Sequence, residues 1–297
     1  MGRLKVGLLG KGGLVGQMYQ QRLKDHPLFQ LTFAPTKKEI DQLERAKECA
    51  LIFSALPNQV AAIYEPLYAK NGGIVFSSAS CHRLQKEVPL IIPEINGKLL
   101  KGWKGRLIAK PNCTLQSFLL PLYPLHQRFG LKKASVTHLQ SVSGAGKGFA
   151  LKENVIPYIE GEEEKTEQET LKILGGISIP ISVHCTRVPV LEGHLSCVSA
   201  SFEKTPTLAE VLHCWKTFKG VDLPSAPENV LIYFNQNDRP QPQLDCHLGG
   251  GMSVSIGRLR RCPLFDIRFV ALSHNLVRGA AGGGLLTAEL YVRENQI

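Results

Sequence analysis

The sequence predicts an α/β protein in which a doubly wound parallel sheet is followed by a second domain built on a mixed or largely antiparallel sheet. Short apolar runs alternate with helical patterns through the first hundred residues, which is typical of parallel strands joined by helices. A glycine-rich loop comes directly after the first of these runs. Beyond residue 130 the strand patterns become longer, and several alternate polar and apolar residues.

The first part of the chain reads as strands that end in polar loops. Continuous apolar runs indicate buried parallel strands, and the segments between them have helical spacing. We expect strands at 4–9, 28–34, 49–55, 74–77, 88–93 and 106–109, with helices at 14–23 and 59–70.

Glycines follow the first predicted strand and open the first predicted helix. Gly10, Gly12, Gly13 and Gly16 allow a tight turn, and they let the backbone at Leu14 and Val15 approach a phosphate. This context is that of a Rossmann-like dinucleotide-binding loop. The spacing differs from G-x-G-x-x-G, so an ordinary glycine-rich connection is the alternative.

The end of the second predicted strand indicates which dinucleotide binds. It carries no Asp or Glu to hold a ribose 2′-hydroxyl, and continues instead into Thr36, Lys37 and Lys38. A hydroxyl and two ammonium groups suit a 2′-phosphate, which favours NADP over NAD. The alternative is a basic loop that is only solvated.

Cys113 lies where a strand pattern gives way to a helix pattern at 115–128. Free backbone N–H groups and the positive end of the helix dipole favour a thiolate there, and a thiolate can attack an acyl carbon. The alternative is a small buried apolar side chain, as most free cysteines are.

The rest of the chain supplies the second sheet. The patterns predict strands at 134–140, 182–190, 195–202, 252–259 and 267–272, and helices at 149–158 and 162–174. The proline-containing stretch 221–245 is expected to be irregular. A glycine-interrupted helix at 274–292 is expected to return to the first domain.

Composition excludes several classes of function. The net charge of +10 favours anionic partners, yet the basic residues are dispersed, so we expect no nucleic-acid binding. No apolar run approaches the ~20 residues of a membrane span, and the N-terminus shows no signal peptide, which predicts a cytoplasmic protein without membrane association. None of the eight cysteines has Cys-x-x-Cys spacing, so no disulfide framework or metal site is expected.

Several motifs together resemble one enzyme family. In order they are the glycine loop, V-P-L-I-I-P-E-I-N at 88–96, P-N-C-T at 111–114, Gln140 with S-V-S-G-A-G, N-V-I-P-Y-I-E-G-E-E-E-K at 154–165 and R-V-P-V-L-E-G-H at 187–194. This series resembles aspartate-β-semialdehyde dehydrogenase of the branch shared by many bacteria, archaea and fungi. The likeness runs over essentially the whole chain.

The resemblance implies a function and a domain plan. The expected reaction is the NADPH-dependent reductive dephosphorylation of L-4-aspartyl phosphate to L-aspartate 4-semialdehyde through a cysteine thioester, in the pathway to lysine, threonine and methionine. A dinucleotide-binding domain would span 1–111, a catalytic and dimerisation domain 112–272, and a returning helix 273–297. The expected assembly is a homodimer or homotetramer.

The resemblance also assigns roles to residues. Catalytic roles fall on Cys113 as nucleophile, His194 as acid and base, and Gln140. Substrate-binding roles fall on Arg187, Glu162, Lys165, Arg83 and Asn112. Cofactor contacts fall on Gly10, Gly12, Gly13, Leu14, Val15, Gly16, Thr36, Lys37, Ser143, Gly144, Asn275 and Gly279.

Two rivals and two departures accompany this interpretation. N-acetyl-γ-glutamyl-phosphate reductase shares the chemistry but usually has P-G-C in place of P-N-C, and a non-catalytic NADP-binding relative would not need intact Cys113 and His194. The cofactor loop reads G-K-G-G-L-V-G where the family usually has G-A-T-G-x-V-G, and His274 stands where Asp is frequent.

Overall fold

The structure is a computed structural model that describes residues 2–297, and the chain divides into two compact units. Unit 1 comprises the chain up to Pro111 together with Asp222–Ser225 and Ala280–Ile297; unit 2 comprises Asn112–Val221 and Ala226–Gly279. Among the described residues, no helix has both the length and the apolar character needed to cross a bilayer. The functional division at 1–111, 112–272 and 273–297 stays a proposal.

Unit 1 is built on a five-stranded parallel sheet in the order β2-β1-β3-β4-β5. Its strands are β1 (Leu4–Leu9), β2 (Phe29–Phe33), β3 (Leu51–Ser54), β4 (Val75–Ser77) and β5 (Leu107–Ala109), and its helices are α1 (Leu14–Leu23), α2 (Asn58–Lys70), α3 (Pro93–Asn96) and α8 (Gly282–Asn295). The strand order reverses between β1 and β3, and such a switch point is where open α/β sheets bind ligands.

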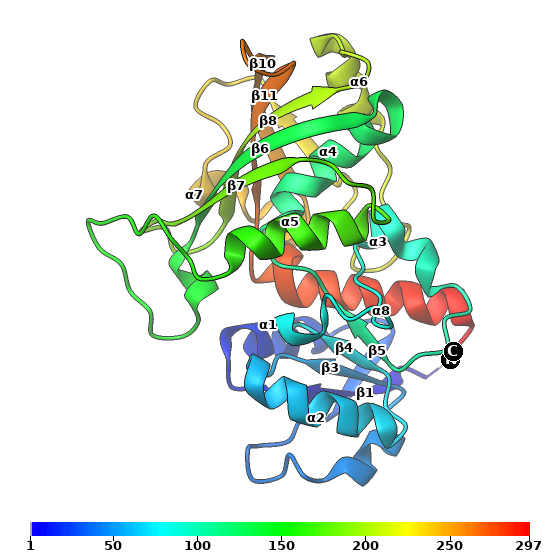
Figure 1. The fold of residues 1–297 in the computed structure, drawn as a ribbon. Coiled ribbons are helices and arrows are strands. Elements are labelled where there is room, and N and C mark those ends of the chain that lie inside the picture. Colours follow the sequence, from blue (N-terminus) through cyan, green and yellow to red (C-terminus); the bar gives the residue numbers. More distant parts are fainter. Residues whose placement is uncertain (1) are drawn as a thin grey trace. The chain divides into compact units, whose positions relative to one another are not determined.

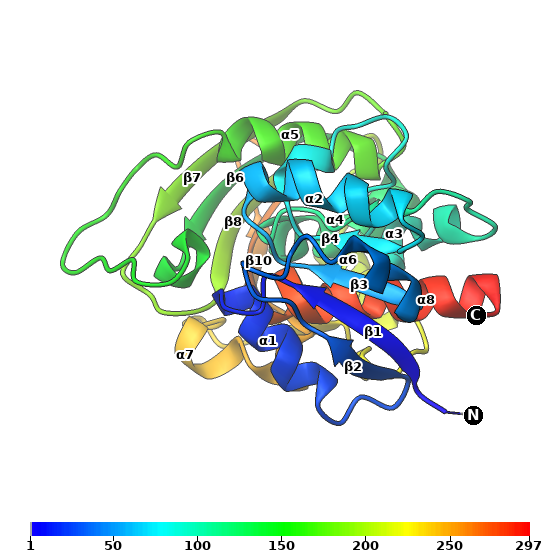
Figure 2. The same ribbon diagram turned by 90° about the horizontal axis from the view of Figure 1, so that it is seen from below.

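Both faces of this sheet are covered, which makes it doubly wound. Successive residues of β3 belong to different clusters of buried side chains: Phe53 packs with Tyr19 of α1 and Leu285 of α8, and Ile52 packs with Tyr68 of α2. Figure 2 shows the sheet between α1 and α2. The predicted doubly wound domain is confirmed.

Unit 2 contains a six-stranded mixed sheet in the order β7-β6-β8-β11-β10-β9. The strands are β6 (Leu131–Gln140), β7 (Ile181–Arg187), β8 (His194–Phe202), β9 (Leu231–Phe234), β10 (Val254–Arg261) and β11 (Ile267–Ser273). The helices are α4 (Leu115–Phe129), α5 (Glu162–Ile173), α6 (Leu208–Thr217) and α7 (Pro242–Asp245). Figure 1 shows β7, β6, β8 and β11 side by side, with α5 along β7.

Three expectations for secondary structure were wrong. Residues 149–158 form no helix: Glu153 has a positive φ of 51°, and Ile156 instead makes an isolated bridge to Arg187. Residues 88–93 supply only a bridge at Leu90 before α3 begins at Pro93. The stretch 221–245 contains β9 and α7, because its prolines lie outside the strand and at the first position of the helix.

The C-terminal segment also differs from the single helix expected at 274–292. A turn of π-helix at Val277–Ala281 precedes α8, which begins at Gly282 and ends at Asn295. Gly284 allows α8 to lie against α1, because a Cβ there would come within 1.9 Å of the Tyr19 hydroxyl oxygen. Gly284 therefore allows close packing of α8 against α1 within unit 1.

Candidate active site

Cys113 lies in the turn that leads into α4, and its side chain is partly exposed. The Asn112 side chain shapes this turn, because its Oδ1 accepts from the Thr114 N–H at 3.3 Å and lies 3.4 Å from the Cys113 Sγ. The His194 Nε2 lies 3.1 Å from the same sulfur. The structure thus brings together the predicted nucleophile and the predicted acid and base.

The hydrogen bonds of His194 determine where its proton lies. The backbone N–H of Ser141 donates to His194 Nδ1 at 3.1 Å, so a neutral ring must carry its proton on Nε2, toward the sulfur. The ring is fully buried, and burial, together with the charge of Arg187, holds the pKa of His194 well below its usual range. His194 is therefore a neutral donor facing Cys113.

Arg187 lies at the end of β7 and is buried. Its Nη1 donates to the Ser141 carbonyl oxygen at 2.8 Å, and burial lowers the pKa of the guanidinium. Gly144 leaves room beside this group, because a Cβ there would lie 2.7 Å from Arg187 Nη1 and 3.2 Å from His194 Nε2. A bulkier residue at 144 would fill the space between the two side chains.

Sheet register aligns the functional side chains along one edge. Gln140 pairs with Arg187 across the parallel strands β6 and β7, and Leu139 pairs with Leu195 across β6 and β8. Because β8 runs antiparallel to β6, its first residue, His194, lies at the edge where β6 ends.

Glu162 joins several of the predicted substrate ligands. Its Oε2 accepts from Asn112 Nδ2 at 2.7 Å and from Gln140 Nε2 at 3.2 Å, while Oε1 lies 3.4 Å from the Lys165 Nζ. Only 16% of the Glu162 side chain is exposed, and 33% of that of Lys165. A half-buried carboxylate and a more open ammonium thus lie within one turn of α5.

Sequence reasoning missed Glu169, which lies two turns further along α5. Its Oε2 accepts from the backbone N–H of Asn112 at 2.7 Å, and the side chain is buried. It fixes the residue that precedes Cys113, and it is therefore a positioning residue. In the sequence it is one of several acidic residues on a polar helix, so only the fold reveals its partner.

A second group that sequence reasoning missed lies behind the site. His138 is fully buried two residues before Gln140, and its Nδ1 bonds to the Ser196 hydroxyl at 2.8 Å. Burial lowers the pKa of His138 to about 4, so the ring is neutral at physiological pH. Its position on the inner face of β6 is also what a core residue would show, and the sequence gives no signal that separates the two.

Four residues of unit 2 that were expected to contact cofactor also shape the site. Asn275 accepts from the Gly193 N–H at 2.9 Å and donates to the Ser143 hydroxyl at 2.9 Å, so it orients the residue before His194. A Cβ at Gly279 would lie 2.6 Å from the Cys113 Cβ. Gly144 borders Arg187 and His194 as described above. Their contacts with cofactor remain a proposal.

Comparison with known proteins identifies the family. Residues 5–103 match the model described as semialdehyde dehydrogenase, NAD binding domain, and residues 122–278 match its dimerisation domain. The aspartate-semialdehyde dehydrogenase of Archaeoglobus fulgidus is 37% identical, and the match covers 99% of this chain and 100% of that protein. The chain belongs to the aspartate-semialdehyde dehydrogenase family.

Two further comparisons bear on cofactor and substrate. The crystal structure of aspartate semialdehyde dehydrogenase with NADP from Candida albicans has a TM-score of 0.89, is 31% identical and covers all of both chains. The malonyl CoA reductase (NADP) of Metallosphaera sedula is 34% identical, with 99% of this chain and 98% of that protein covered. Full-length likeness in this family therefore extends to a protein with a different named substrate.

The glycine loop of unit 1 fits the NADP cofactor that the family uses. Gly10 has a φ of +82°, and a Cβ on Gly16 would lie 2.1 Å from the Gly10 carbonyl oxygen, so both glycines are needed for the turn itself. A Cβ at Gly12 would meet no atom within 4 Å, which leaves open space beside Gly13, Leu14 and Val15 at the start of α1. A dinucleotide phosphate at this helix N-terminus would face free N–H groups.

The predicted 2′-phosphate contacts are less simple than the sequence indicated. The Thr36 hydroxyl donates to Glu39 Oε2 at 2.8 Å, while Lys37 is exposed. Lys11, one of the departures in the glycine loop, reaches the Ala34 carbonyl oxygen at 2.6 Å. Three ammonium-bearing side chains, those of Lys11, Lys37 and Lys38, and the Glu39 carboxylate therefore belong to the region where β2 ends.

Arg83 belongs to unit 1 and is buried, and its Nη2 donates to the Ser78 carbonyl oxygen at 2.9 Å. It follows the polar loop after β4, at the carboxyl edge of the parallel sheet. Its role as a phosphate ligand remains a proposal.

Proposed function

We propose that this chain is the NADPH-dependent enzyme that converts L-4-aspartyl phosphate to L-aspartate 4-semialdehyde and phosphate through a thioester on Cys113. The observation that carries this proposal is the 3.1 Å contact between the Cys113 sulfur and a His194 ring whose proton is held on Nε2. Family membership supports the same reaction.

The first step needs an anionic sulfur. The helix N-terminus, the His194 Nε2–H and the guanidinium of Arg187 each favour negative charge on Cys113. The sulfur attacks the carbonyl carbon of the acyl phosphate, the bond from that carbon to the phosphate oxygen breaks, and a thioester forms. Phosphate leaves as the anion and takes up the one proton that the overall reaction consumes.

The second step reduces the thioester. NADPH, when bound, supplies the hydride. The carbonyl oxygen then carries negative charge, and the His194 Nε2–H beside the sulfur is placed to stabilise it. When the carbon–sulfur bond breaks, the aldehyde leaves, and the Cys113 thiolate again accepts the hydrogen bond from the His194 Nε2–H. Ser141 keeps the ring in one orientation through both steps.

Two side chains of opposite charge can hold the amino acid end of the substrate. The guanidinium of Arg187 offers two parallel donors to an α-carboxylate, and the half-buried Glu162 carboxylate suits an α-ammonium group. Malonyl-CoA has no ammonium group, so Glu162 favours the aspartyl substrate over the one named for the Metallosphaera relative.

The substrate assignment is tested with purified enzyme and three acyl donors. NADPH oxidation should be fast with β-aspartyl phosphate and at least ~10²-fold slower, as kcat/KM, with malonyl-CoA and with N-acetyl-γ-glutamyl phosphate. A Glu162→Gln variant should lose most of this preference against malonyl-CoA. Faster turnover of either rival substrate would overturn the assignment.

Lys165 has two possible roles. It can bind phosphate as a point charge, or it can be an i, i+3 partner of Glu162 worth a few tenths of a kcal/mol. In the reverse reaction, Lys165→Ala should raise the KM for phosphate more than the KM for semialdehyde. An unchanged KM for phosphate would make the lysine structural and leave Arg83 and Asn112 as the phosphate ligands.

We further propose that the enzyme works in the cytoplasm as a homodimer or as a pair of homodimers. The dimerisation-domain match over 122–278 supports self-association. Sedimentation equilibrium of the purified protein distinguishes these states, and a monomer at micromolar concentration would contradict both.

A further inference from the structure

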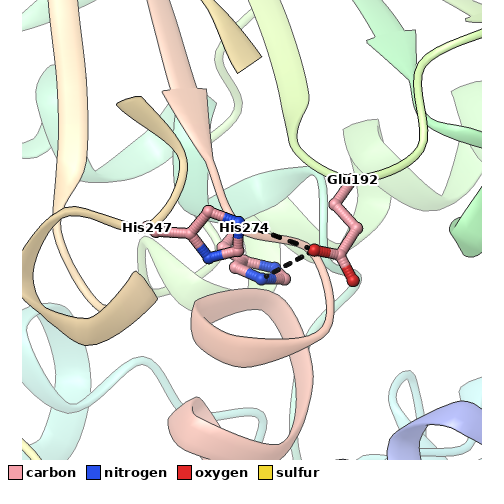
Figure 3. Close-up of side chains that lie close together, drawn as sticks. All are labelled: Glu192, His247 and His274. Atoms are coloured by element: carbon pink, nitrogen blue, oxygen red, sulfur yellow. Dashed lines mark ion pairs between the residues drawn. The ribbon is translucent and has the colours of Figure 1, made fainter. Parts of the chain in front are cut away.

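Three side chains outside the Cys113–His194 pair meet at one point of unit 2. The Glu192 Oε2 lies 3.5 Å from His274 Nε2 and 3.7 Å from His247 Nε2, and one ligand atom from each residue lies within 4.8 Å of the other two. Figure 3 shows both imidazole rings turned toward the same carboxylate. None of the three has a role in the reaction proposed above.

These distances are close to those of a metal site. A tetrahedral zinc ion with bonds of about 2.0–2.1 Å separates its ligand atoms by roughly 3.4 Å. The two distances from the carboxylate oxygen exceed this spacing by only a few tenths of an ångström. The two imidazole nitrogens lie within 4.8 Å of each other, so side-chain rotations that bring the two rings closer would place all three donors on one ion.

The backbone holds the three donors in place although they come from distant parts of the chain. Gly193, next to Glu192, donates its N–H to Asn275, next to His274, at 2.9 Å. Gly251 donates its N–H to the His247 carbonyl oxygen at 2.9 Å, and a Cβ on Gly251 would lie 3.1 Å from the His274 ring. The two histidine rings are also in edge-to-face contact, with centroids 4.9 Å apart.

The cluster can be reached from solvent. The side chain of His247 is 68% exposed and that of Glu192 is 29% exposed, whereas His274 is buried. Glu192 and His247 line a pocket of about 650 Å³ whose other walls are residues 189–191, 241–243 and 246. An ion entering by this pocket would keep a coordination position open for water or a small ligand.

We propose that Glu192, His247 and His274 form a site for a zinc-class divalent cation. Two imidazole nitrogens and one carboxylate oxygen are a donor set that zinc uses in proteins, whereas Mg²⁺ and Ca²⁺ prefer oxygen ligands. The sequence predicted no metal site, because none of its cysteines has Cys-x-x-Cys spacing and these three residues are far apart along the chain. A partly exposed ion pair between the carboxylate and protonated histidines is the alternative.

A bound ion would stabilise the two segments that flank the candidate active site. Glu192 is separated from His194 only by Gly193, and His274 precedes Asn275, which holds that glycine. A bound ion would join the loop before β8 to the turn after β11. We expect it to raise the melting temperature of the protein.

The test measures zinc binding by competition with a chromophoric chelator, in full-length protein carrying Cys113→Ser so that the reactive sulfur cannot bind the ion. The background protein should bind one equivalent of zinc, and His247→Gln should weaken that binding by about 100-fold or more, since even the loss of partners outside the ligand set costs 10–100-fold. Glu192→Gln should act in the same direction. His213→Gln, at an exposed position on α6, is the matched control and should leave affinity unchanged.

Zinc should also raise the melting temperature of the background protein and of His213→Gln, but not that of His247→Gln. The proposal is overturned if the background protein binds no stoichiometric zinc, or if His247→Gln binds it as tightly as the background does. His247 is largely exposed, so its substitution should not prevent folding.

Discussion

His26 in unit 1 and His194 in unit 2 are both buried rings whose Nδ1 accepts backbone N–H groups. His26 takes its bonds from Leu28 and Phe29 at 3.2 Å, and His194 takes its bond from Ser141. A neutral ring in either place must carry its proton on Nε2. The backbone thus sets the same tautomer in both units.

The two rings differ in what their Nε2 meets. In His26 it lies 2.8 Å from the fully buried carboxylate of Glu289, which also accepts from Ser225. In His194 it lies 3.1 Å from the partly exposed sulfur of Cys113. In the first pair the two buried groups satisfy each other's hydrogen-bonding capacity, and the pair stabilises the fold. The second leaves a nucleophile open to a ligand, so the partner and its exposure decide what the same ring does.

Replacing Cys113, the partly exposed partner of His194, should give the largest effect on activity. Cys113→Ser should lower turnover by ~10³-fold or more while NADPH binding and the melting temperature are kept, because the sulfur carries the acyl group. Steady-state rates and fluorescence titration with NADPH measure the two properties. Cys197→Ser, an exposed cysteine on β8, is the control. Near-normal turnover by Cys113→Ser would refute the mechanism.

Replacing Glu289, the buried partner of His26, should instead lower the stability of the fold. Glu289→Ala leaves His26 and Ser225 without their buried acceptor, so the free energy of unfolding should fall by about 3 kcal/mol. Urea denaturation measures this, and kcat of the folded fraction should stay within about twofold of the wild type. Glu294→Ala, on the same helix but in a surface pair with Arg293, should cost about 0.5 kcal/mol or less. If Glu289→Ala were as stable as that control, the two rings would not differ as we infer.

Arg187→Lys tests whether the buried guanidinium of unit 2 binds substrate. A lysine keeps the charge but loses the planar fork, so the KM for aspartate semialdehyde should rise about tenfold or more, whereas stability changes little. Initial rates with varied semialdehyde measure this. Arg128→Lys, in a surface pair with Glu210, should leave KM unchanged. An unaltered KM for Arg187→Lys would assign the guanidinium to the fold alone.

Lys37 belongs to unit 1 but, unlike the buried pair of His26 and Glu289, its charge is exposed and can contact a ligand. NADPH should be preferred to NADH by about tenfold in kcat/KM, and Lys37→Ala should remove most of this preference. Lys98→Ala, exposed elsewhere in unit 1, is the control. An unchanged ratio would leave Thr36, Lys38 or Lys11 as the group that recognises the 2′-phosphate.

The smallest expected effect concerns His82, the other buried histidine of unit 1 that meets a carboxylate. A hydrogen bond to Glu65 raises the pKa of His82, so its stabilising contribution is present below the unfolded pKa of about 6.5 and is lost as pH rises through the folded value. The stability difference between wild type and Glu65→Gln should therefore be larger at pH 5.5 than at pH 8.5. The exposed Glu48→Gln should show no such trend in urea denaturation, and an opposite trend for Glu65→Gln would contradict the assignment.

Local patterns predicted the parts of the protein that depend on local structure. The apolar runs and the glycine loop gave the parallel sheet, and the change from strand to helix pattern gave the place of Cys113. Partners brought together by the fold could not be predicted. The bond from Asn112 to Glu169 joins residues 57 positions apart, and the ring orientation of His194 depends on the backbone N–H of Ser141, 53 positions away and just past the end of β6. The helix expected at 149–158 failed because bridge formation by Ile156 outweighed its helical spacing.

The register of the unit 2 sheet has a consequence for how this family can vary in length. Alignment with the Archaeoglobus relative runs over 343 positions although this chain has 297 residues, so the relative has segments that this chain lacks. A change of length outside the strands leaves the pairing of Gln140 with Arg187 unshifted. One residue added or removed within β6, β7 or β8 would turn every following side chain to the opposite face and break the alignment of the edge. The loops of this chain can therefore differ in length without moving the edge residues, whereas the lengths of β6, β7 and β8 cannot change by a single residue.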